Sequence, residues 1–438
     1  MITEKEILKA LSGIIDPDFK KDIVTLGFVK NIDIKDKKVS FDIELTTPAC
    51  PVKDEFKKSA ENIVKGLDGI EEVIVNMTSS KKSHALKIEN SGLKGVKSII
   101  AISSCKGGVG KSTIAAYLAK EIARRGFKVG LLDADLFGPS IPILFNLRNS
   151  KAQLTPDNKF NPLIKDNLKI MSFGFLMGDS PAIMRGPMVS GYIQQILHNV
   201  DWGELDYLLV DFPPGTGDVQ LTITQSVQLD GAVIITTKQS LSVADVARGI
   251  LMFEKVNVPM LGIIENMSYF ICDNCEKKHF IFGGRDNSHL TERFGLGTLA
   301  QLPVSTELAS DLVKPTENKI IKTAADNMIM ALGKSSMSLE KKPQITFDQE
   351  KITLKWPNGE ETVVGNFDLR LSCKCARCVD EMSGSQILKK EDILPDIKAE
   401  EIQPLGNYAI SVKWNDGHSS GIFPYKRIME MASGGKQK

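Results

Sequence analysis

Residues 98–126 read SIIAISSCKGGVGKSTIAAYLAKEIARRG. An apolar, β-branched run comes first, a glycine-rich loop follows, and a segment of good helix formers completes the stretch. A phosphate-binding loop needs this order, because the backbone N–H groups of the loop and of the first helical turn then point at the same anion. The stretch therefore predicts a nucleotide-binding α/β fold.

The loop supplies the parts of a phosphate cradle. Its glycines allow backbone N–H groups to approach phosphate oxygens, Lys111 is expected to reach the terminal phosphates, and the Ser112 hydroxyl is expected to bind Mg²⁺. Cys105 stands where the usual pattern has its first glycine, and we expect it to serve packing. The residues expected to contact nucleotide are Lys106, Gly107, Gly108, Val109, Gly110, Lys111, Ser112 and Thr113.

Carboxylates close two later apolar runs. Asp211 ends the run in LLVDF, where a carboxylate holds Mg²⁺ through water beside the loop. Asp133 and Asp135 follow the run in LLDADLF, and we expect them to face the terminal phosphate and to position water or metal. A helix cap is the alternative for either of these two. Asp218, in PPGTGD, is either a contact to the terminal phosphate or an ordinary turn carboxylate.

The rest of the chain extends this α/β core on both sides. Apolar runs alternate with helical segments, the βαβ rhythm of a mostly parallel sheet covered on both faces. A small α+β domain is expected before this P-loop NTPase domain, and a small β-rich metal-binding domain after it. Stretches rich in Ser, Gly and Lys at 78–97 and 333–343 predict linkers. The expected domains are residues 1–90, 97–335 and 343–430.

Composition excludes several classes of protein. The 438 residues contain 55 Lys and Arg against 54 Asp and Glu, so no overall basic field favours nucleic acid or anionic lipid. No apolar run approaches the ~20 residues of a membrane-spanning helix, and the acidic start lacks the features of a signal or transit peptide. We therefore expect a cytoplasmic protein without nucleic-acid or membrane partners.

Five of the seven cysteines fall in two tight groups, which suits metal ligands better than disulfides. Cys272 and Cys275 form a C-x-x-C pair, which fills half of a tetrahedral site. Two copies of the chain would supply four thiolates, enough for a 4Fe–4S cluster. Zinc held by this pair and His279, with an open or distant fourth ligand, is one alternative. A purely structural pair is the other.

The second group is C-x-C-x-x-C, formed by Cys373, Cys375 and Cys378. Three thiols in six residues are too crowded for independent packing, and His418 is the expected fourth ligand of a structural zinc. A second iron–sulfur cluster and no metal are the alternatives. Cys50 stands at the expected start of a helix, where the helix N-terminus would stabilise a thiolate; a small buried thiol is the alternative.

The segments KGGVGKST, DADLFGPSIP, DFPPGTGD and IENMSYF resemble the Mrp/ApbC group of P-loop ATPases, relatives of MinD, ParA and nitrogenase iron protein. The resemblance covers about residues 97–335. It implies a homodimer that encloses nucleotide, with Lys106 crossing to the nucleotide of the partner. It also implies a bridging 4Fe–4S cluster on Cys272 and Cys275. Asn266 falls where these relatives contact the adenine base, and a loop cap is its alternative.

The flanking segments carry resemblances of their own. DPDFKKDIVTLGFV and TTPACP resemble the iron–sulfur assembly domain often fused to such ATPases, in which the cysteine matching Cys50 is implicated in cluster handling. LSCKCARCVDE and VKWNDGHSSGIFPY resemble the N-terminal domain of γ-butyrobetaine hydroxylase, which holds structural zinc. The layout is similar to the plastid member of the Mrp family and its bacterial relatives. Plastid members lack the C-x-x-C pair, so the bridging cluster follows the bacterial pattern.

These observations give one main functional hypothesis. The chain is expected to bind and hydrolyse ATP with Mg²⁺, to assemble a cluster, and to deliver it to apo iron–sulfur proteins in contact with cluster-assembly proteins. The expected catalytic residues are Lys106, Lys111, Asp135 and Asp211. One alternative is a MinD- or ParA-like positioning ATPase, although RIMEMASGGKQK is short and weakly patterned for a membrane-binding helix. Another is a zinc-stapled adaptor with a vestigial ATPase.

Overall fold

The computed structural model describes residues 2–16, 20–45, 53–79, 91–177, 186–237, 243–281, 294–305, 318–337, 342–375, 377–380, 385–406 and 408–433. These residues belong to two compact units. The first is Met1–Ser83 together with Ile329–Met337, and the second is His84–Met328 together with Ser338–Lys438.

The N-terminal part of the first unit is a small α+β fold, as the sequence predicts. A three-stranded sheet in the order β3-β4-β5 packs against two helices, and buried and partly exposed residues alternate along β4 because one face of the sheet is covered. Thr3 and Glu6 form a capping box that starts the first helix. The elements are α1 (Glu4–Leu11), β1 (Ile15–Asp16), β2 (Lys21–Asp22), β3 (Val29–Lys35), β4 (Lys38–Leu45), α2 (Lys53–Lys65) and β5 (Glu72–Ser79).

The second unit is built on a nine-stranded sheet in the order β13-β12-β11-β6-β10-β7-β9-β8, with β14 also paired to β12. The central strands pair in parallel, whereas β8 and β13 are antiparallel edge strands. The strands are β6 (Ile99–Ser103), β7 (Val129–Asp133), β8 (Leu163–Lys165), β9 (Leu168–Ser172), β10 (Tyr207–Asp211), β11 (Gly231–Thr237), β12 (Met260–Ile271), β13 (Lys278–His279) and β14 (Thr298–Val304).

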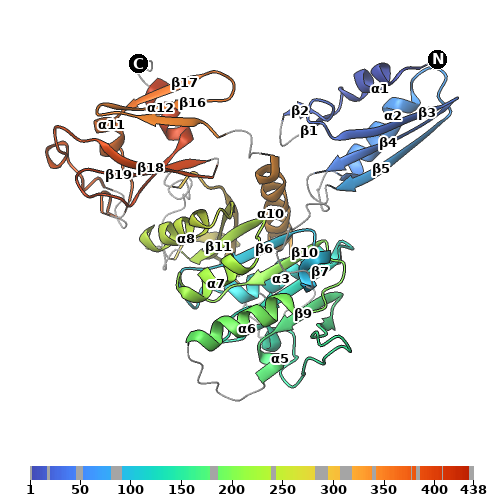
Figure 1. Ribbon diagram of the computed structural model, residues 1–438, viewed down its shortest axis with the longest axis horizontal. Helices are drawn as coiled ribbons and strands as arrows, with labels where there is room; N and C mark the ends of the chain where they lie inside the picture. Colours follow the sequence, from blue (N-terminus) through green and yellow to red (C-terminus); the bar gives the residue numbers. More distant parts are fainter. Residues whose placement is uncertain are drawn as a thin grey trace. The chain divides into compact units, whose positions relative to one another are not determined.

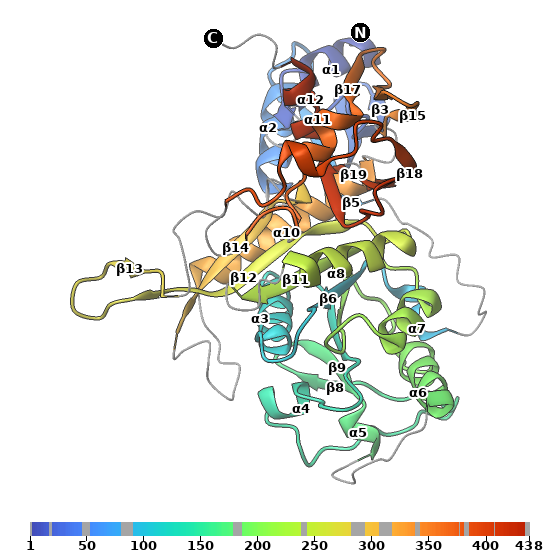
Figure 2. The same cartoon turned by 90° about the vertical axis from the view of Figure 1, so that its left-hand side faces the viewer.

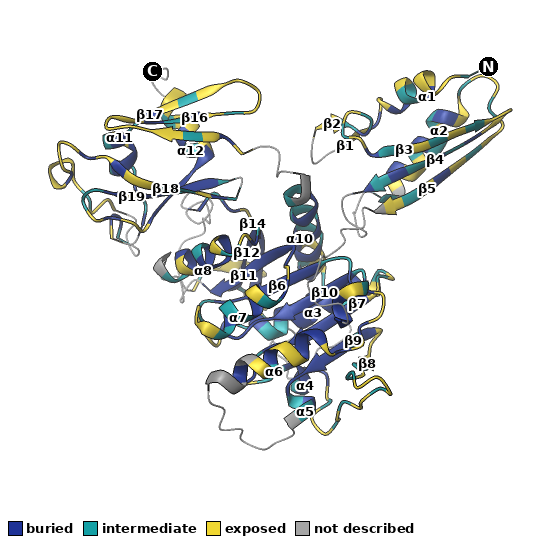
Figure 3. Cartoon of the chain, in the orientation of Figure 1, coloured by how far each residue is buried: buried dark blue, intermediate teal, exposed yellow. Residues whose placement is uncertain are grey.

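Helices cover both faces of this sheet, with α3 on one side and α7 and α8 on the other (Figure 2). Every residue of β6, β7, β10 and β11 is therefore buried, as the dark blue strands of Figure 3 show. The predicted α/β class with a mostly parallel sheet is confirmed. The helices are α3 (Lys111–Arg124), α4 (Ile141–Leu144), α5 (Gly174–Met177), α6 (Gly186–His198), α7 (Asp218–Ser226) and α8 (Val243–Lys255). Helix α10 (Lys319–Met337) also begins in this unit, but its residues from Ile329 on belong to the first unit.

The parallel register brings the expected site together at one edge of the sheet. Asp211, the last residue of β10, pairs with Ile102 of β6 on one side and with Asp133 of β7 on the other. The loop that follows β6 thus begins beside both carboxylates. Ligands bind outside the carboxyl ends of parallel strands for this reason.

The C-terminal module of the second unit is β-rich, as predicted, and also contains short helices (Figure 1). It has two antiparallel three-stranded sheets, in the orders β15-β16-β17 and β18-β19-β20. Its elements are β15 (Gln344–Phe347), β16 (Lys351–Lys355), β17 (Glu361–Gly365), α11 (Asn366–Leu371), η4 (Lys390–Asp392), β18 (Ala399–Leu405), β19 (Ala409–Trp414), β20 (Gly421–Pro424) and α12 (Tyr425–Ser433).

The structure describes only parts of the two predicted linkers, since residues 80–90 and 338–341 lie outside the described residues. The prediction was wrong for the parts that form regular structure. A 3₁₀ turn, η1 (Gly92–Gly95), buries Leu93, and a Cβ at Gly92 would lie 1.7 Å from the carbonyl oxygen of Val200. Glycine at this position therefore allows a close backbone contact that composition alone does not reveal. At the second linker, α10 continues to Met337. Among the described helices, none is long and apolar enough to cross a membrane.

Candidate functional site

The loop between β6 and α3 has the backbone geometry of a phosphate cradle. Gly108 (φ +77°) and Gly110 (φ +83°) adopt left-handed conformations that favour glycine. A Cβ placed at Gly107 or Gly108 would meet no atom within 4 Å, so the space beside these two residues is open to a ligand. The loop thus fits phosphate oxygens, which need room and convergent N–H groups.

Asn266 supports this loop from β12. Its Nδ2 donates to the carbonyl oxygen of Val109 at 2.9 Å, and a Cβ at Gly110 would lie 2.4 Å from the same Nδ2. The amide therefore holds the loop backbone, which matches the loop-cap alternative for Asn266. Its expected contact to the adenine base stays a prediction.

Lys111, Ser112 and Asp211 form the charged centre of the site. Lys111 Nζ lies 2.5 Å from Asp211 Oδ1 and 3.3 Å from Ser112 Oγ, and both charged groups are buried. Burial raises the pKa of Asp211, although Lys111 opposes the shift. Among the described residues, Asp211 Oδ2 is buried without a hydrogen-bond partner. A buried carboxylate oxygen is costly unless it is solvated or paired, so Mg²⁺ with its bound water fits here.

Asp133 and Asp135 play different parts. Asp133 is fully buried, where its Oδ2 accepts hydrogen bonds from Ser172 Oγ (3.0 Å) and from the Ile141 backbone N–H (3.1 Å). Burial, and then the charge of Asp211, raises the pKa of Asp133 to about 7. Asp133 therefore holds the start of α4 in place, a role similar to the helix-cap alternative expected for it. Asp135 is only partly buried, which leaves it the better placed of the two to meet a ligand.

Helix α8 contacts the loop from the side. Lys106 Nζ pairs with Asp245 Oδ2 at 2.9 Å, and Asp245 also pairs with Arg248 at 3.2 Å. A Cβ at Gly249 would lie 2.7 Å from Cys105 Sγ, so helix and loop approach closely at these two small residues. Burial raises the pKa of Cys105 to about 11, which keeps it a thiol and agrees with the expected packing role.

The C-x-x-C pair lies on the hairpin that joins β12 to β13, which projects from the sheet in Figure 2. Cys272, Cys275 and His279 each offer a donor atom, and these atoms all lie within 4.8 Å of one another. Cys272 is partly exposed, and the other two residues are exposed. The backbone N–H groups of Cys275 and Asn274 point at the Cys272 sulfur and lower the pKa of that thiol.

The C-terminal module brings Cys373, Cys375, Cys378 and His418 into one buried group. The distances from His418 Nε2 to the three sulfurs, in sequence order, are 3.4, 3.5 and 4.0 Å. In a tetrahedral zinc site with Zn–S of about 2.3 Å and Zn–N of about 2.0–2.1 Å, nitrogen and sulfur lie about 3.6 Å apart. The four residues therefore fit a tetrahedral metal ion.

A charged pair supports this group from outside. Arg370 Nη1 donates to Cys378 Sγ at 3.4 Å, and Arg370 Nε donates to Asp416 Oδ2 at 2.8 Å. Asp416 Oδ1 in turn accepts from the backbone N–H of His418 at 2.9 Å. Partners of this kind orient metal ligands. Sequence reasoning found the four donors and missed Arg370 and Asp416.

Comparison with known proteins shows the family. Residues 95–335 match the family model described as NUBPL iron-transfer P-loop NTPase. The chain belongs to this family. Residues 4–77 of this NUBPL-type NTPase match the model for iron–sulfur cluster assembly proteins, and residues 344–429 match the γ-butyrobetaine hydroxylase-like N-terminal model. All three resemblances found in the sequence are confirmed.

Two individual relatives agree with the family models, and one solved structure is similar over part of the chain. The NUBPL-type NTPase is 41% identical to "Fe-S cluster assembly factor HCF101, chloroplastic" of Arabidopsis thaliana, over 98% of this chain and 83% of the relative. It is 42% identical to the "Iron-sulfur cluster carrier protein" of Synechocystis, over 70% of this chain and 89% of the relative. A nucleotide-binding protein of Archaeoglobus fulgidus, solved with ADP, is 38% identical over 54% of this chain and 89% of its own, with a TM-score of 0.45.

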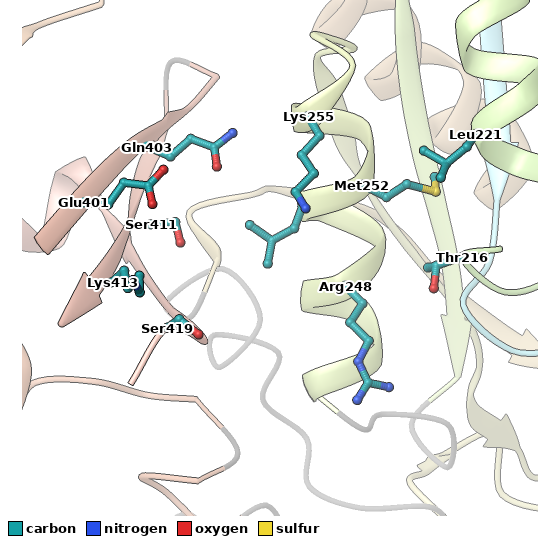
Figure 4. A pocket seen from close by; sticks show the side chains of 11 residues that line it. Thr216, Leu221, Arg248, Met252, Lys255, Glu401, Gln403, Ser411, Lys413 and Ser419 are labelled. Atoms are coloured by element: carbon teal, nitrogen blue, oxygen red, sulfur yellow. The ribbon is translucent and has the colours of Figure 1, made fainter. Parts of the chain in front are cut away.

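Helix α8 of the NUBPL-type NTPase also contacts the C-terminal module. Glu254 is buried, and its carboxylate accepts hydrogen bonds from the Gly406 N–H and the Tyr408 hydroxyl, both at 2.8 Å. A hollow of about 470 Å³ lies next to this contact, between α8 and strands β18 and β19 (Figure 4). Charged side chains such as Arg248 and Lys413 line it. No sequence pattern indicates Glu254, because its partners lie about 150 residues away.

Two predicted residues stand apart from these groups. Cys50 lies in residues 46–52, outside the described residues. Asp218 is the exposed first residue of α7, where its charge suits the helix N-terminus. Its expected contact to a terminal phosphate stays a prediction.

Proposed function

We propose that this NUBPL-type NTPase is an ATP-hydrolysing carrier that assembles an iron–sulfur cluster and transfers it to apoproteins. The observation that carries the proposal is the path of β12. Asn266 of this strand holds the nucleotide loop, and Cys272 directly follows its last residue, Ile271. One strand therefore connects the loop that would sense the nucleotide to the thiols that would hold the cluster. The names of the relatives from Arabidopsis and Synechocystis support the same function.

The cargo in this proposal is a 4Fe–4S cluster bound between two copies of the chain. Each copy supplies Cys272 and Cys275, and the two pairs complete the four thiolates such a cluster takes. Both residues are reachable by solvent, so an acceptor protein could approach the cluster. The partners are therefore a second copy, apo iron–sulfur proteins and cluster-assembly proteins.

Hydrolysis of ATP would rest on positioning and electrostatics. Lys111 would neutralise the terminal phosphates, and Asp135 would orient the attacking water. Ser112 and Asp211 would hold Mg²⁺, which supplies positive charge to the phosphate oxygens. Lys106 would leave Asp245 and reach the nucleotide of the partner copy. The remaining expected nucleotide contacts are Gly107, Gly108, Val109, Gly110, Thr113, Asp133 and Asn266.

The C-terminal donors would hold a structural zinc. Zinc suits three thiolates and one imidazole in a closed tetrahedral site, and the ion would hold together the strands that carry the donors. We propose domain bounds of 1–90, 97–335 and 343–430. We further infer a cytoplasmic location, because a reducing compartment keeps thiols available as ligands.

Anaerobic reconstitution with iron and sulfide tests this function. The native protein should gain a visible iron–sulfur absorbance and pass it to an apo acceptor. Cys272→Ser with Cys275→Ser should gain none while hydrolysing ATP at the native rate. Lys111→Ala should lose hydrolysis by at least about 100-fold, because removing preorganised charge stabilisation costs this much.

Cys105→Ser is the matched control. Cys105 is another cysteine of the second unit and is packed against α8, so this variant should load the cluster like the native chain. Equal cluster loading in the Cys272 and Cys275 double variant would contradict the proposal.

A further inference from the structure

The β12–β13 hairpin brings a histidine from the same chain to the cysteine pair. Strand β13 runs antiparallel to β12, with His279 opposite Phe270. The turn is closed by the Cys272 N–H, which donates to Lys277 O at 3.1 Å, and by the Glu276 N–H, which donates to Cys272 O at 2.8 Å. Backbone hydrogen bonds therefore fix the positions from which all three donors project.

The donor atoms already have nearly the spacing of a metal site. Cys275 Sγ and His279 Nε2 lie 3.9 Å apart, against about 3.6 Å for nitrogen and sulfur on one tetrahedral zinc ion. The Cys272 sulfur completes a triangle in which no two donor atoms are more than 4.8 Å apart. Shifts of at most about 1 Å in these partly or fully exposed side chains would bring all three onto one ion.

The hairpin turn also holds one donor in place. The N–H groups of Cys275 and Asn274 point at the Cys272 sulfur. Other side chains of the hairpin also contact one another: the Tyr269 ring packs against Phe280 at a tilt, and Lys278 Nζ lies over the Tyr269 ring. The three donors are therefore presented on a hairpin whose other side chains pack among themselves.

We propose that Cys272, Cys275 and His279 of a single chain bind one thiophilic divalent ion, zinc or iron(II), with a fourth position open to an exchangeable ligand. Among the described residues, no fourth Cys, His, Asp or Glu joins this group. Open coordination is typical of sites that exchange or react. The inference rests on the proposed function in that the same two thiols would hold the cluster in the dimer. It adds that His279 lets one chain hold metal without a second copy.

Cobalt(II) titration of the metal-free protein tests the site, because thiolate–cobalt absorbance reports the ligands directly. The native chain should bind two cobalt ions per chain, one at each Cys/His group, while sedimentation shows a monomer. Cys272→Ser with Cys275→Ser should retain one. His279→Ala should bind the hairpin cobalt at least about 10-fold more weakly. Pulsed paramagnetic resonance should then show nitrogen coupling only at the C-terminal cobalt, where His418 supplies it.

Lys277→Ala is the matched control, since this exposed neighbour in the turn should leave cobalt binding unchanged. Native-like hairpin affinity in His279→Ala, or one hairpin cobalt per two chains, would overturn the inference. Cluster reconstitution separates the two proposals. A native protein that binds hairpin cobalt through His279 but gains no iron–sulfur cluster would sink the proposed function and leave this site standing.

Discussion

The two Cys/His groups of this chain use similar donors in opposite settings. In the C-terminal module, four donors are buried and surround one point. On the β12–β13 hairpin, three donors lie at the surface and leave one direction free. Closed four-ligand sites stabilise folds, whereas sites with an open position exchange ligands or react. We therefore propose that coordination number and burial, more than cysteine spacing, separate a metal ion that is retained from one that is released.

The surroundings of the two groups differ in the same sense. In the C-terminal module, Arg370 donates a hydrogen bond to the Cys378 sulfur, and Asp416 accepts one from the His418 backbone N–H. Arg370 and Asp416 are also bonded to each other. At the hairpin, backbone N–H groups of the turn contact the Cys272 sulfur. A positive guanidinium beside a thiolate also offsets the charge of a three-thiolate zinc site.

The largest expected effect comes from removing one donor of each group. Cys373→Ser should cost several kcal/mol and unfold the C-terminal module, because a structural zinc supplies ~10 kcal/mol of folding free energy and Cys373 is fully buried. Cys275→Ser, the exposed counterpart, should leave the melting temperature unchanged. Calorimetry measures both. A stable Cys373→Ser module with native zinc content would break the comparison.

A chelator should distinguish the two groups by rate. With zinc loaded at both, a coloured chelator should take the hairpin ion in a fast phase and the C-terminal ion in a phase at least about 10-fold slower, because the buried donors must open before they release metal. Stopped-flow absorbance follows both phases. The double variant at Cys272 and Cys275 should lack the fast phase, and a single slow phase in the native chain would contradict the assignment.

A smaller effect is expected from changing the Arg370–Asp416 pair beside the C-terminal donors. Asp416→Asn keeps the shape but weakens the contact to Arg370, and should lower zinc affinity by about 10–100-fold. Asp273→Asn, inside the hairpin turn, serves as control and should not change C-terminal zinc binding. Competition with a fluorescent zinc chelator measures the zinc affinity of each variant. Equal affinity in Asp416→Asn and the native chain would show that the Arg370–Asp416 pair does not orient the ligands.

The smallest effect is expected at the contact between α8 and the C-terminal module. Tyr408→Phe removes one hydrogen bond to the buried Glu254 of α8 and should cost about 0.5–1.5 kcal/mol in urea unfolding. The loss of stability is limited because Glu254 keeps its hydrogen bond from the Gly406 N–H. Tyr192→Phe, in α6, is a control tyrosine far along the chain from this contact. A loss above about 3 kcal/mol in the free energy of unfolding would contradict this, because one hydrogen bond does not contribute so much.

The sequence predicts the parts of this protein whose residues are close together in the chain. The phosphate loop and both cysteine groups were found from spacing, because their donors fall within a few residues or follow a strand. Asp245, Glu254 and Arg370 were not found, since their partners come from distant elements and carry no periodic signal. The buried role of Asp133 also depends on Ser172 of a neighbouring strand, which spacing does not reveal.

The most direct test of the central claim follows both metals through one transfer reaction. The protein, loaded with ⁵⁷Fe and sulfide at the hairpin and with zinc at the C-terminal group, is mixed with an apo acceptor and ATP. Iron and zinc are then counted on each protein after separation. The account predicts that iron moves to the acceptor and that about one zinc per chain stays behind. Iron that stays on the chain while zinc leaves would contradict it.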